Sequence, residues 1–492
     1  MNANLILRSL VILYCSSIPL NLIFNNLHEL GKNSYYDLIQ PLCIFGLIFI
    51  FMYWVEKKTE KKDLFYGLFL INFIFFFNFK EAFNLIDFIS PYTRLTVIIL
   101  VYLLSIVAVY SFYKLARLMN FLIIFLGAMI IYSLSIWSIN SFSYLTSLQK
   151  IPKSSVISTS KNKSNGGFNV YYIIADGLTD SKNFKRMTGD HLLLPSQLKQ
   201  YGFIDIINSR SNYVGSASSI ASIFHLDYFR NSTSTLTNPA DSSYYPSILY
   251  SEQSSLYKVL KNNNYNLRYF PAWYSSCIPG KSYQCIKESF VLNKVSLKIF
   301  DNSLISYLEN KSIGAKFNFL LRREVDALKN LNRFILNNNY DNKNFFFIHH
   351  MQPHDPYFFD SNCAHISTNK FTVSVNYSNS VECLTKNLLV TVNNILSKDP
   401  GAFIIIQGDH GWTLKEDASL LESAEYYNYR SSITNVIKPN KFCEVPQNHS
   451  MGPINSARLI VSCINNNAYD RLPEITYIPG TNYSETGRLI KR

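Results

Sequence analysis

The sequence predicts an α/β protein in two parts. An N-terminal bundle of about five transmembrane helices precedes an α/β/α sandwich with a mostly parallel sheet. Two observations carry this prediction. The first 140 residues are dominated by Leu, Ile, Phe, Val and Tyr. The rest of the 492-residue chain alternates strand-like apolar runs with helical patterns such as 326–337 and 384–396, which is typical of a parallel sheet covered by helices.

Five apolar stretches in the N-terminal part have the composition of membrane-spanning helices. A span needs about 20 apolar residues. The third stretch is the weakest, because it is short and Asn72 and Asn78 interrupt it. A signal peptide followed by a helical domain is the alternative, but a cleaved leader does not explain the later stretches. The five stretches cover residues 4–24, 38–55, 64–79, 95–113 and 119–139.

The positions of Lys and Arg in the short loops predict how these helices are oriented. The loop at 56–63 contains four lysines, and the loop after the fourth stretch contains Lys114 and Arg117. The loops after the first and third stretches contain fewer basic residues. Because positively charged loops stay in the cytoplasm, we expect everything after about residue 140 to lie outside it.

The composition also predicts where the parts of the chain begin and end. The transmembrane domain covers 1–140, and a linker rich in Ser, Lys, Asn and Gly covers 141–167. Such a segment is typical of a connection between domains. We expect a catalytic domain over 168–475 and a C-terminal tail over 476–492.

Six of the eight cysteines lie in the soluble part, where an oxidising compartment favours disulfides. Six cysteines allow about 15 pairings. The sequential pattern closes short surface loops and is our prediction. A zinc site is the alternative, but the sequence contains no Cys-x-x-Cys. The expected pairs are Cys277–Cys285, Cys363–Cys383 and Cys443–Cys463.

The net charge of +13 does not by itself predict a nucleic-acid partner. The sequence has no basic helix, no zinc-finger spacing and no aromatic-basic RNA motif. A basic domain beside a membrane suits anionic lipid head groups or anionic glycolipids. We therefore expect no nucleic-acid binding.

Two apolar runs each lead into an Asp residue, and a glycine comes one or two positions after that Asp. The run 171–175 leads into Asp176, and the run 403–406 leads into Asp409 and His410. In open α/β sheets, ligands bind at the C-terminal ends of the strands. Carboxylate oxygen and imidazole nitrogen together suit zinc or manganese. The plain alternatives are a helix-capping Asp at 176 and a solvated turn after 406.

The densest group of imidazoles follows the apolar run 345–348. His349, His350 and His354 lie in a segment that two prolines stiffen. Imidazoles near a phosphoryl or sulfuryl group can donate hydrogen bonds, hold a metal or protonate a leaving group. The prolines argue against a helix, so the spacing does not guarantee that His350 and His354 converge. His349 has the alternative of packing on the opposite side of the strand.

A serine preceded by glycine begins a segment with apolar residues at helical spacing over 216–224. A hydroxyl at a helix N-terminus lies at the positive end of the helix dipole, which favours an alkoxide and an incoming anion. A nearby metal would make it a nucleophile. An ordinary N-cap serine is the common alternative. These residues alone do not choose between Ser216, Ser218 and Ser219.

In order and spacing, these four pieces resemble the alkaline phosphatase superfamily. A strand with Asp-Gly is followed about 40 residues later by a hydroxyl group, then by a His-x-x-x-His loop and by Asp-His-Gly. The closer likeness is to membrane-anchored sulfatase-domain proteins of bacterial envelopes. These include phosphoethanolamine transferases and lipoteichoic-acid-synthase-like phosphoglycerol transferases. The resemblance covers the whole chain in architecture and about residues 168–475 in motif order.

The resemblance implies roles for individual residues. Asp176, Asp409 and His410 would bind a zinc or manganese ion. Ser216 ends a stretch that looks like the family's nucleophile segment, so it would be both nucleophile and metal ligand. The implied contacts to the phosphoryl group or its leaving group are His350 and His354, and the implied substrate-binding residues are His349, Asn212 and His449.

Two departures from the family pattern bear on the reaction. True sulfatases carry Cys/Ser-x-Pro-x-Arg, whose first residue becomes formylglycine. The nearest match here, 277–281, ends in Lys281 and lies about 100 residues after Asp176, so sulfate-ester hydrolysis is not favoured. Many relatives also place a His soon after Asp-His-Gly, whereas here the next one is His449, 39 residues after His410.

The resemblance implies a multi-pass protein of the bacterial inner membrane with its catalytic domain on the periplasmic or extracellular side. Its reaction would transfer a phosphoethanolamine- or phosphoglycerol-type head group from a membrane lipid donor to an envelope glycolipid or polymer, through a phospho-Ser216 intermediate. One alternative is a tethered phosphodiesterase or sulfatase-like hydrolase of soluble esters. The other is a non-catalytic envelope-assembly protein with the same fold.

Overall fold

The structure is a computed structural model, and it forms two compact units. The first contains residues 1–146 and 290–324, and the second contains 147–289 and 325–492. The structure describes residues 3–25, 39–79, 82, 91–114, 118–148, 167–229, 254–271, 283–286, 296, 299, 303–304, 326–355, 357–364, 366, 371–412, 423–446, 449–478 and 488–491.

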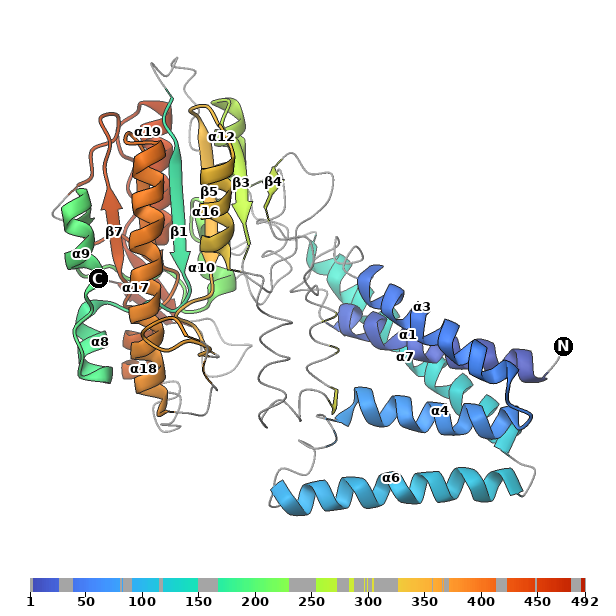
Figure 1. The fold of residues 1–492 in the computed structure, drawn as a ribbon. Helices are drawn as coiled ribbons and strands as arrows, with labels where there is room; N and C mark the ends of the chain where they lie inside the picture. The colour runs from blue at the N-terminus through green and yellow to red at the C-terminus, as the bar shows by residue number, and fades with distance from the viewer. Residues whose placement is uncertain are drawn as a thin grey trace. The chain divides into compact units, whose positions relative to one another are not determined.

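The N-terminal unit contains five apolar helices at the positions of the five predicted stretches (Figure 1). Three of them are long and apolar enough to cross a membrane, over Ile39–Lys57, Leu95–Lys114 and Leu118–Phe142. A shorter apolar helix covers Leu5–Asn21. The apolar N-terminal helices are therefore confirmed. The helices are α1 (Ala3–Asn25), α3 (Ile39–Lys57), α4 (Lys62–Phe77), α6 (Pro91–Lys114) and α7 (Leu118–Leu148).

Apolar side chains and a few polar ties hold these helices together. One buried apolar cluster joins α1, α3, α4, α6 and α7, and it also includes Ile299 from the later segment of this unit. Arg8 of α1 lies 3.5 Å from the buried carboxylate of Glu56 at the end of α3. The Trp137 Nε1 donates to Asn21 Oδ1 at 2.6 Å. Paired polar groups of this kind satisfy side chains that lipid cannot solvate.

The second unit is built on a seven-stranded sheet with the order β2-β7-β6-β1-β5-β3-β4. Neighbouring strands are parallel from β6 to β4, and β7 runs antiparallel to both of its neighbours. The predicted, mostly parallel sheet is thus confirmed. The strands are β1 (Val170–Ala175), β2 (Ile204–Asp205), β3 (Asn266–Phe270), β4 (Gln284–Cys285), β5 (Asn344–His350), β6 (Phe403–Gly408) and β7 (Asn435–Lys438).

Helices cover both faces of this sheet, which makes the predicted sandwich. Strand β1 is buried throughout, and its alternate residues enter two different cores. Val170 and Tyr172 pack with α10 (Ser216–His225), α12 (Ser255–Asn262) and α19 (Pro453–Asn465). Tyr171 and Ile173 pack with the helices of the opposite face. These are α8 (Ser181–Thr188), α9 (Leu194–Leu198), α16 (Ala327–Asn337) and α17 (Val373–Lys398).

Shorter elements complete the second unit. The 3₁₀ helix η2 (Lys199–Tyr201) follows α9, and α18 (Ala424–Ser431) precedes β7. Strands β8 (Ile475–Ile478) and β9 (Arg488–Lys491) form a separate antiparallel pair near the C-terminus.

Two of the three predicted disulfides are confirmed. Cys363 is bonded to Cys383, and Cys443 is bonded to Cys463. The third predicted pair involves Cys277, which lies outside the described residues. Both described disulfides join a loop to a long helix, α17 in the first case and α19 in the second.

Candidate metal and catalytic site

The site is assembled where three neighbouring parallel strands end. Strand β1 lies between β5 and β6, and its last residue, Ala175, is in register with His350 and with Gly408. Asp176 therefore follows β1 at the same edge of the sheet where β5 delivers its histidines and β6 leads into Asp409. This C-terminal edge is where open α/β sheets bind ligands.

The alternation of side chains along β5 separates its two histidines. Phe345 and Phe347 belong to the core under α10, α12 and α19, and His349, two residues further on, points to the same face of the sheet. Phe346 and Ile348 belong to the core on the opposite face, and His350 points to that face as well. Successive residues of a strand point to opposite faces. The strand thus directs His349, and not His350, toward the layer that contains α10.

Two carboxylates and three imidazoles come together at this edge. The His349 Nε2 lies 3.0 Å from Asp176 Oδ2, and the His410 Nε2 lies 3.4 Å from Asp176 Oδ1. One group of potential ligands is Asp176, His354 and His410, and a second is Asp176, His349 and Asp409. Within each group the ligand atoms lie within 4.8 Å of one another. Such separations allow one cation to contact several of these atoms.

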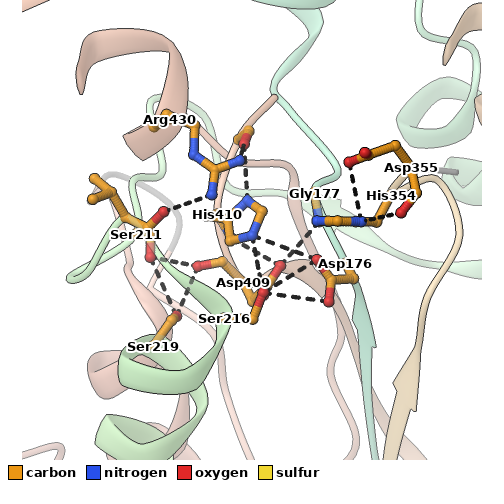
Figure 2. Close-up of polar contacts among 12 residues, drawn as sticks. Asp176, Gly177, Ser211, Ser216, Ser219, His354, Asp355, Asp409, His410 and Arg430 are labelled. Atoms are coloured by element: carbon orange, nitrogen blue, oxygen red, sulfur yellow. Dashed lines mark hydrogen bonds and ion pairs between the residues drawn. The ribbon is translucent and has the colours of Figure 1, made fainter. Parts of the chain in front are cut away.

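Ser216 is the first residue of α10, and its hydroxyl faces this cluster (Figure 2). Its Oγ lies 3.3 Å from each Asp176 oxygen and 3.0 Å from His410 Nε2. The N-cap, Gly215, supplies no side-chain hydrogen bond to the helix N-terminus. Ser219 faces elsewhere, because its Oγ donates to the Asp409 carbonyl at 2.7 Å. Ser216 is thus a candidate serine whose hydroxyl contacts both the Asp176 carboxylate and the His410 ring.

Backbone carbonyls fix the tautomers of two histidines. The His410 Nδ1 lies 2.9 Å from the Gly411 carbonyl oxygen, and the His354 Nδ1 lies 2.5 Å from the Asp355 carbonyl oxygen. A carbonyl oxygen can only accept, so each Nδ1 must carry the proton. The neutral form of each ring then has an unprotonated Nε2, and that of His410 faces Ser216 and Asp176. An acceptor nitrogen in this position suits a metal ligand.

Burial and neighbouring charges set the ionisation of the cluster. Burial on its own raises the pKa of Asp176, but the bond with His349 and the charges of His410 and His354 outweigh it and hold this pKa below its ordinary value. Burial lowers the pKa of His410, and the guanidinium of Arg430 lowers it further. The cluster therefore favours an ionised carboxylate beside a neutral imidazole, which are the forms that bind metal.

The donor atoms fit a divalent cation. Asp176, Asp409 and His410 are almost completely buried, at 1%, 0% and 1% exposure. The Asp409 Oδ1 accepts from the Gly177 and His410 amides, whereas its Oδ2 has no hydrogen-bond partner among the described residues. A buried carboxylate oxygen without a donor is costly unless a cation neutralises it. Oxygen and nitrogen ligands of this kind suit zinc or manganese.

Two glycines allow the loops of the site to approach one another. Gly177 follows Asp176 with φ of +77°, a conformation that side chains other than glycine rarely adopt. A Cβ at Gly411 would lie 2.0 Å from the Tyr429 carbonyl oxygen, so only glycine fits between His410 and the end of α18.

Three of the residues assigned by resemblance lie away from the cluster of acceptors. The His350 Nδ1 lies 3.4 Å from Asp326 at the start of α16, across the sheet from α10. Asn212 is fully buried, and its amide bonds to Ile454, Tyr228 and Ile475. His449 is exposed and belongs to neither ligand group found in the described chain.

The sequence reasoning did not identify Arg430 as part of this site. Its Nη2 donates to the Val214 carbonyl at 2.8 Å, and its Nη1 donates to the Gly411 carbonyl at 3.2 Å. It thereby links the segment before Ser216 to the segment after His410 (Figure 2). No motif surrounds Arg430 in the sequence, because its place depends on how α18 returns to the sheet edge.

Comparison with known families agrees with this geometry. The family model described as Sulfatase matches residues 169–436, more than half of the chain. The chain belongs to the sulfatase family. The matched region begins one residue before β1 and ends within β7, so it contains all three strand ends and Ser216. A search of curated protein sequences found no significant match.

Solved structures similar to this sulfatase-family protein have low sequence identity. The zinc complex of the periplasmic domain of EcEptC from Escherichia coli is 10% identical, with 69% of this chain and 96% of that chain covered and a TM-score of 0.44. Lipooligosaccharide phosphoethanolamine transferase A from Neisseria meningitidis is 12% identical, with 94% and 96% covered and a TM-score of 0.42. The lipoteichoic acid synthase LtaP from Listeria monocytogenes is 13% identical, with 69% and 88% covered and a TM-score of 0.40.

Proposed function

We propose that this sulfatase-family protein is a membrane-anchored, metal-dependent transferase of the bacterial envelope. It moves a phosphoryl-linked head group, of the phosphoethanolamine or phosphoglycerol type, from a membrane lipid to an envelope glycolipid or polymer. The order and spacing of the motifs, which resemble those of phosphoethanolamine and phosphoglycerol transferases, favour these head groups. The active side chains are Ser216, Asp176, Asp409, His410 and His354.

The position of Ser216 is the observation that carries this proposal. Its Oγ lies within 3.3 Å of Asp176 and His410, at the N-terminus of a ten-residue helix whose cap offers no side chain. The positive end of the helix dipole suits an incoming phosphoryl group and favours a serine alkoxide. An ordinary capping serine would instead accept a bond from its own helix.

In the first half-reaction, Ser216 Oγ attacks the phosphorus of the donor lipid. A new P–O bond to serine forms as the P–O bond to the lipid alcohol breaks. The serine proton leaves to water. The departing lipid oxygen takes a proton from Nε2 of His354, which acts here in its imidazolium form while Nδ1 keeps its bond to the Asp355 carbonyl. This ring is oriented by its bond to the Asp355 carbonyl and is about one-third exposed, with 30% of its side chain accessible. His354 is thus accessible to substrate while it lies beside the cluster.

In the second half-reaction, an acceptor hydroxyl attacks the same phosphorus and releases Ser216. His354 now accepts the proton of the incoming hydroxyl, as microscopic reversibility requires. Serine recovers its proton from water. The products are the acceptor carrying the head group and the regenerated enzyme.

A divalent ion is part of the proposal because the acceptor atoms need one. Asp176, Asp409, His410 and Ser216 would hold zinc or manganese, which supplies Lewis-acid polarisation of the phosphoryl group. We propose that His349 positions Asp176 through their 3.0 Å contact. The proposal does not require His350, Asn212 or His449 to touch the reacting group.

Lysines and aromatic residues of the membrane helices bear on how these helices are oriented. Four lysines lie over aromatic rings near loop ends of α3, α4 and α6, for example Lys58 at 3.9 Å from Trp54 and Lys114 at 5.1 Å from Tyr110. Aromatic and basic residues are enriched where helices meet the cytoplasmic interface. We therefore propose that this end of the helices is cytoplasmic and that the catalytic unit lies on the outer side.

Mass spectrometry of the full-length protein tests this function. The purified protein is incubated in vesicles that contain phosphatidylethanolamine or phosphatidylglycerol, and the peptide containing Ser216 is analysed. We expect it to gain the head group with its phosphate, and we expect no such gain in Ser216→Ala. If neither lipid labels the wild-type serine, the proposed function is wrong. Labelling followed by transfer only to water would instead indicate the tethered hydrolase.

A further inference from the structure

Tyr377 is a fully buried side chain of α17 that no motif in the sequence identifies. Its hydroxyl donates to the Gly177 carbonyl at 2.8 Å and accepts from the Thr179 amide at 3.1 Å. Both partners lie in the turn that directly follows Asp176. The hydroxyl therefore satisfies two backbone groups of a turn in which Gly177 has a positive φ.

The ring of Tyr377 contacts the second loop of the site. It stacks on Trp412 with ring centroids 3.9 Å apart and planes 1° apart. Trp412 comes two residues after His410, and Gly411 between them has no space for a side chain. A flat stacked pair restricts how far this loop can move sideways.

The same cluster extends to the third loop. The Trp412 Nε1 donates to the Tyr357 hydroxyl at 2.6 Å, and Tyr357 lies three residues after His354. The rings of Tyr357 and Tyr377 are 6.3 Å apart and nearly perpendicular. Tyr357 and Trp412 are also buried, at 6% and 5% exposure. Tyr357, Tyr377 and Trp412 thus form one aromatic group. This group contacts the turn after β1 and the loops that follow β5 and β6, which are the segments that carry candidate ligands.

We propose that Tyr377 is a positioning residue for the metal site. Its hydrogen bonds to Gly177 and Thr179 fix the turn after Asp176. Its contacts with Trp412 and Tyr357 hold the loops of His410 and His354 at a fixed distance from that turn. This inference rests on the proposed function, since it assumes that the cluster around Asp176 binds metal. Among the described residues, none of these three aromatic side chains belongs to either group of potential metal ligands.

The competing explanation is that Tyr377 is an ordinary core residue that contributes only to stability. The two explanations differ in what the hydroxyl does. Tyr377→Phe keeps the ring, its stacking on Trp412 and nearly all of its volume, and it removes only the bonds to the turn. A positioning role predicts weaker metal binding, because residues that orient metal ligands typically change affinity about 10- to 100-fold.

A matched control is available in the same sheet. Tyr171 is also fully buried, and its hydroxyl lies 2.9 Å from that of Tyr340. It belongs to β1 but sits near the start of the strand, away from the edge that carries Asp176. Tyr171→Phe removes the same atom from an equally buried tyrosine and disturbs no loop of the site.

Zinc titration of the full-length protein in detergent tests the inference. We expect Tyr377→Phe to bind Zn²⁺ about tenfold more weakly than wild type, and Tyr171→Phe to bind it with unchanged affinity. Excess Zn²⁺ should restore labelling of Ser216 in Tyr377→Phe. The melting temperatures of the two metal-free variants should be similar.

The outcomes separate this inference from the proposed function. If wild type binds Zn²⁺ and Tyr377→Phe binds it equally well, the positioning role is wrong and the proposed function stands. Equal weakening in both variants would show a general loss of stability and would also overturn it. If wild-type protein binds neither Zn²⁺ nor Mn²⁺, the metal site itself is wrong and both conclusions fall.

Discussion

At the scale of single residues, the site depends on acceptors that converge without enough donors. The carboxylates of Asp176 and Asp409 lie 3.4 Å and 3.7 Å from the unprotonated Nε2 of His410, and the Ser216 hydroxyl lies 3.0 Å from the same nitrogen. Such an arrangement is unfavourable in a buried site unless a cation occupies it. We therefore expect the same residues to give the site its affinity for a divalent metal.

The first prediction concerns the choice among serines. Ser216→Ala should lower head-group transfer by at least about a thousandfold, because the covalent step loses its nucleophile. Ser218→Ala, two residues further along the same helix, should retain transfer. Rates measured with a fluorescent phospholipid donor check both. Loss of transfer in Ser218→Ala alone would mean that the nucleophile is misassigned.

The second prediction concerns His354 as proton donor. His354→Gln should slow transfer from a lipid, whose alcohol is a poor leaving group, by about 100- to 10,000-fold. It should slow hydrolysis of a nitrophenyl phosphodiester much less, because nitrophenolate leaves without a proton. The ratio of the two rates is the measurement. An equal loss with both substrates would contradict the assigned role.

The sequence predicted that Asp176 and Asp409 follow strand ends, but not which histidine faces them. Asp176 and Asp409 each follow an apolar run, which is visible in the sequence. The run before His349 and His350 is apolar at every position, since β5 is buried on both faces. Such a run does not show which of its residues face which side of the sheet. Only the packed sheet reveals that His349 faces the same side as Asp176.

At the scale of elements, α17 organises the loops beside the site. Tyr377 bonds to the turn after Asp176, the Ser380 carbonyl accepts from Gln352 at 3.1 Å, and Cys383 is bonded to Cys363. These three residues are three positions apart along one helix, so they lie on one side of it. The periodicity predicted part of this helix, but its contacts join segments too distant for local patterns to show.

The third prediction compares the two disulfides. Each joins cysteines 20 residues apart, so removing either one should cost about 3 kcal/mol of stability through the same loop-closure term. The Cys363–Cys383 bond fixes the loop that begins at His354. The Cys443–Cys463 bond lies near the opposite edge of the sheet, where Phe442 stacks on Phe168 just before β1.

Double serine variants of each pair check this prediction. Cys363→Ser with Cys383→Ser should reduce transfer at a temperature where the protein remains folded. Cys443→Ser with Cys463→Ser should lower the melting temperature by a similar amount and leave transfer unchanged. Equal activity in the two variants would show that the first disulfide contributes only stability.

At the scale of the whole molecule, composition predicted the division between apolar helices and an α/β unit. The apolar helices lie where the five stretches were expected, because twenty-residue apolar runs are unambiguous in sequence. The grouping of residues 290–324 with the first unit was not predicted. That segment mixes apolar and basic residues and lies inside the region expected to be catalytic.

The fourth prediction concerns the side of the membrane. An alkaline phosphatase reporter fused after Lys150 should be active, because the loop charges predict that this point lies outside the cytoplasm. The same reporter fused after Lys58 or Lys114 should be inactive. The reverse pattern would place the catalytic unit in the cytoplasm and exclude an envelope acceptor.

Metal analysis of the purified full-length protein tests the central claim most directly. Asp409→Asn keeps the shape of the side chain and removes its charge, including that at Oδ2, which accepts no hydrogen bond from the described residues. Asp399→Asn is the control, since Asp399 bonds to Asn169 at 2.9 Å near the start of the strands. We predict bound zinc or manganese in wild type and in Asp399→Asn, and its loss in Asp409→Asn. Unchanged metal content in Asp409→Asn would contradict the account.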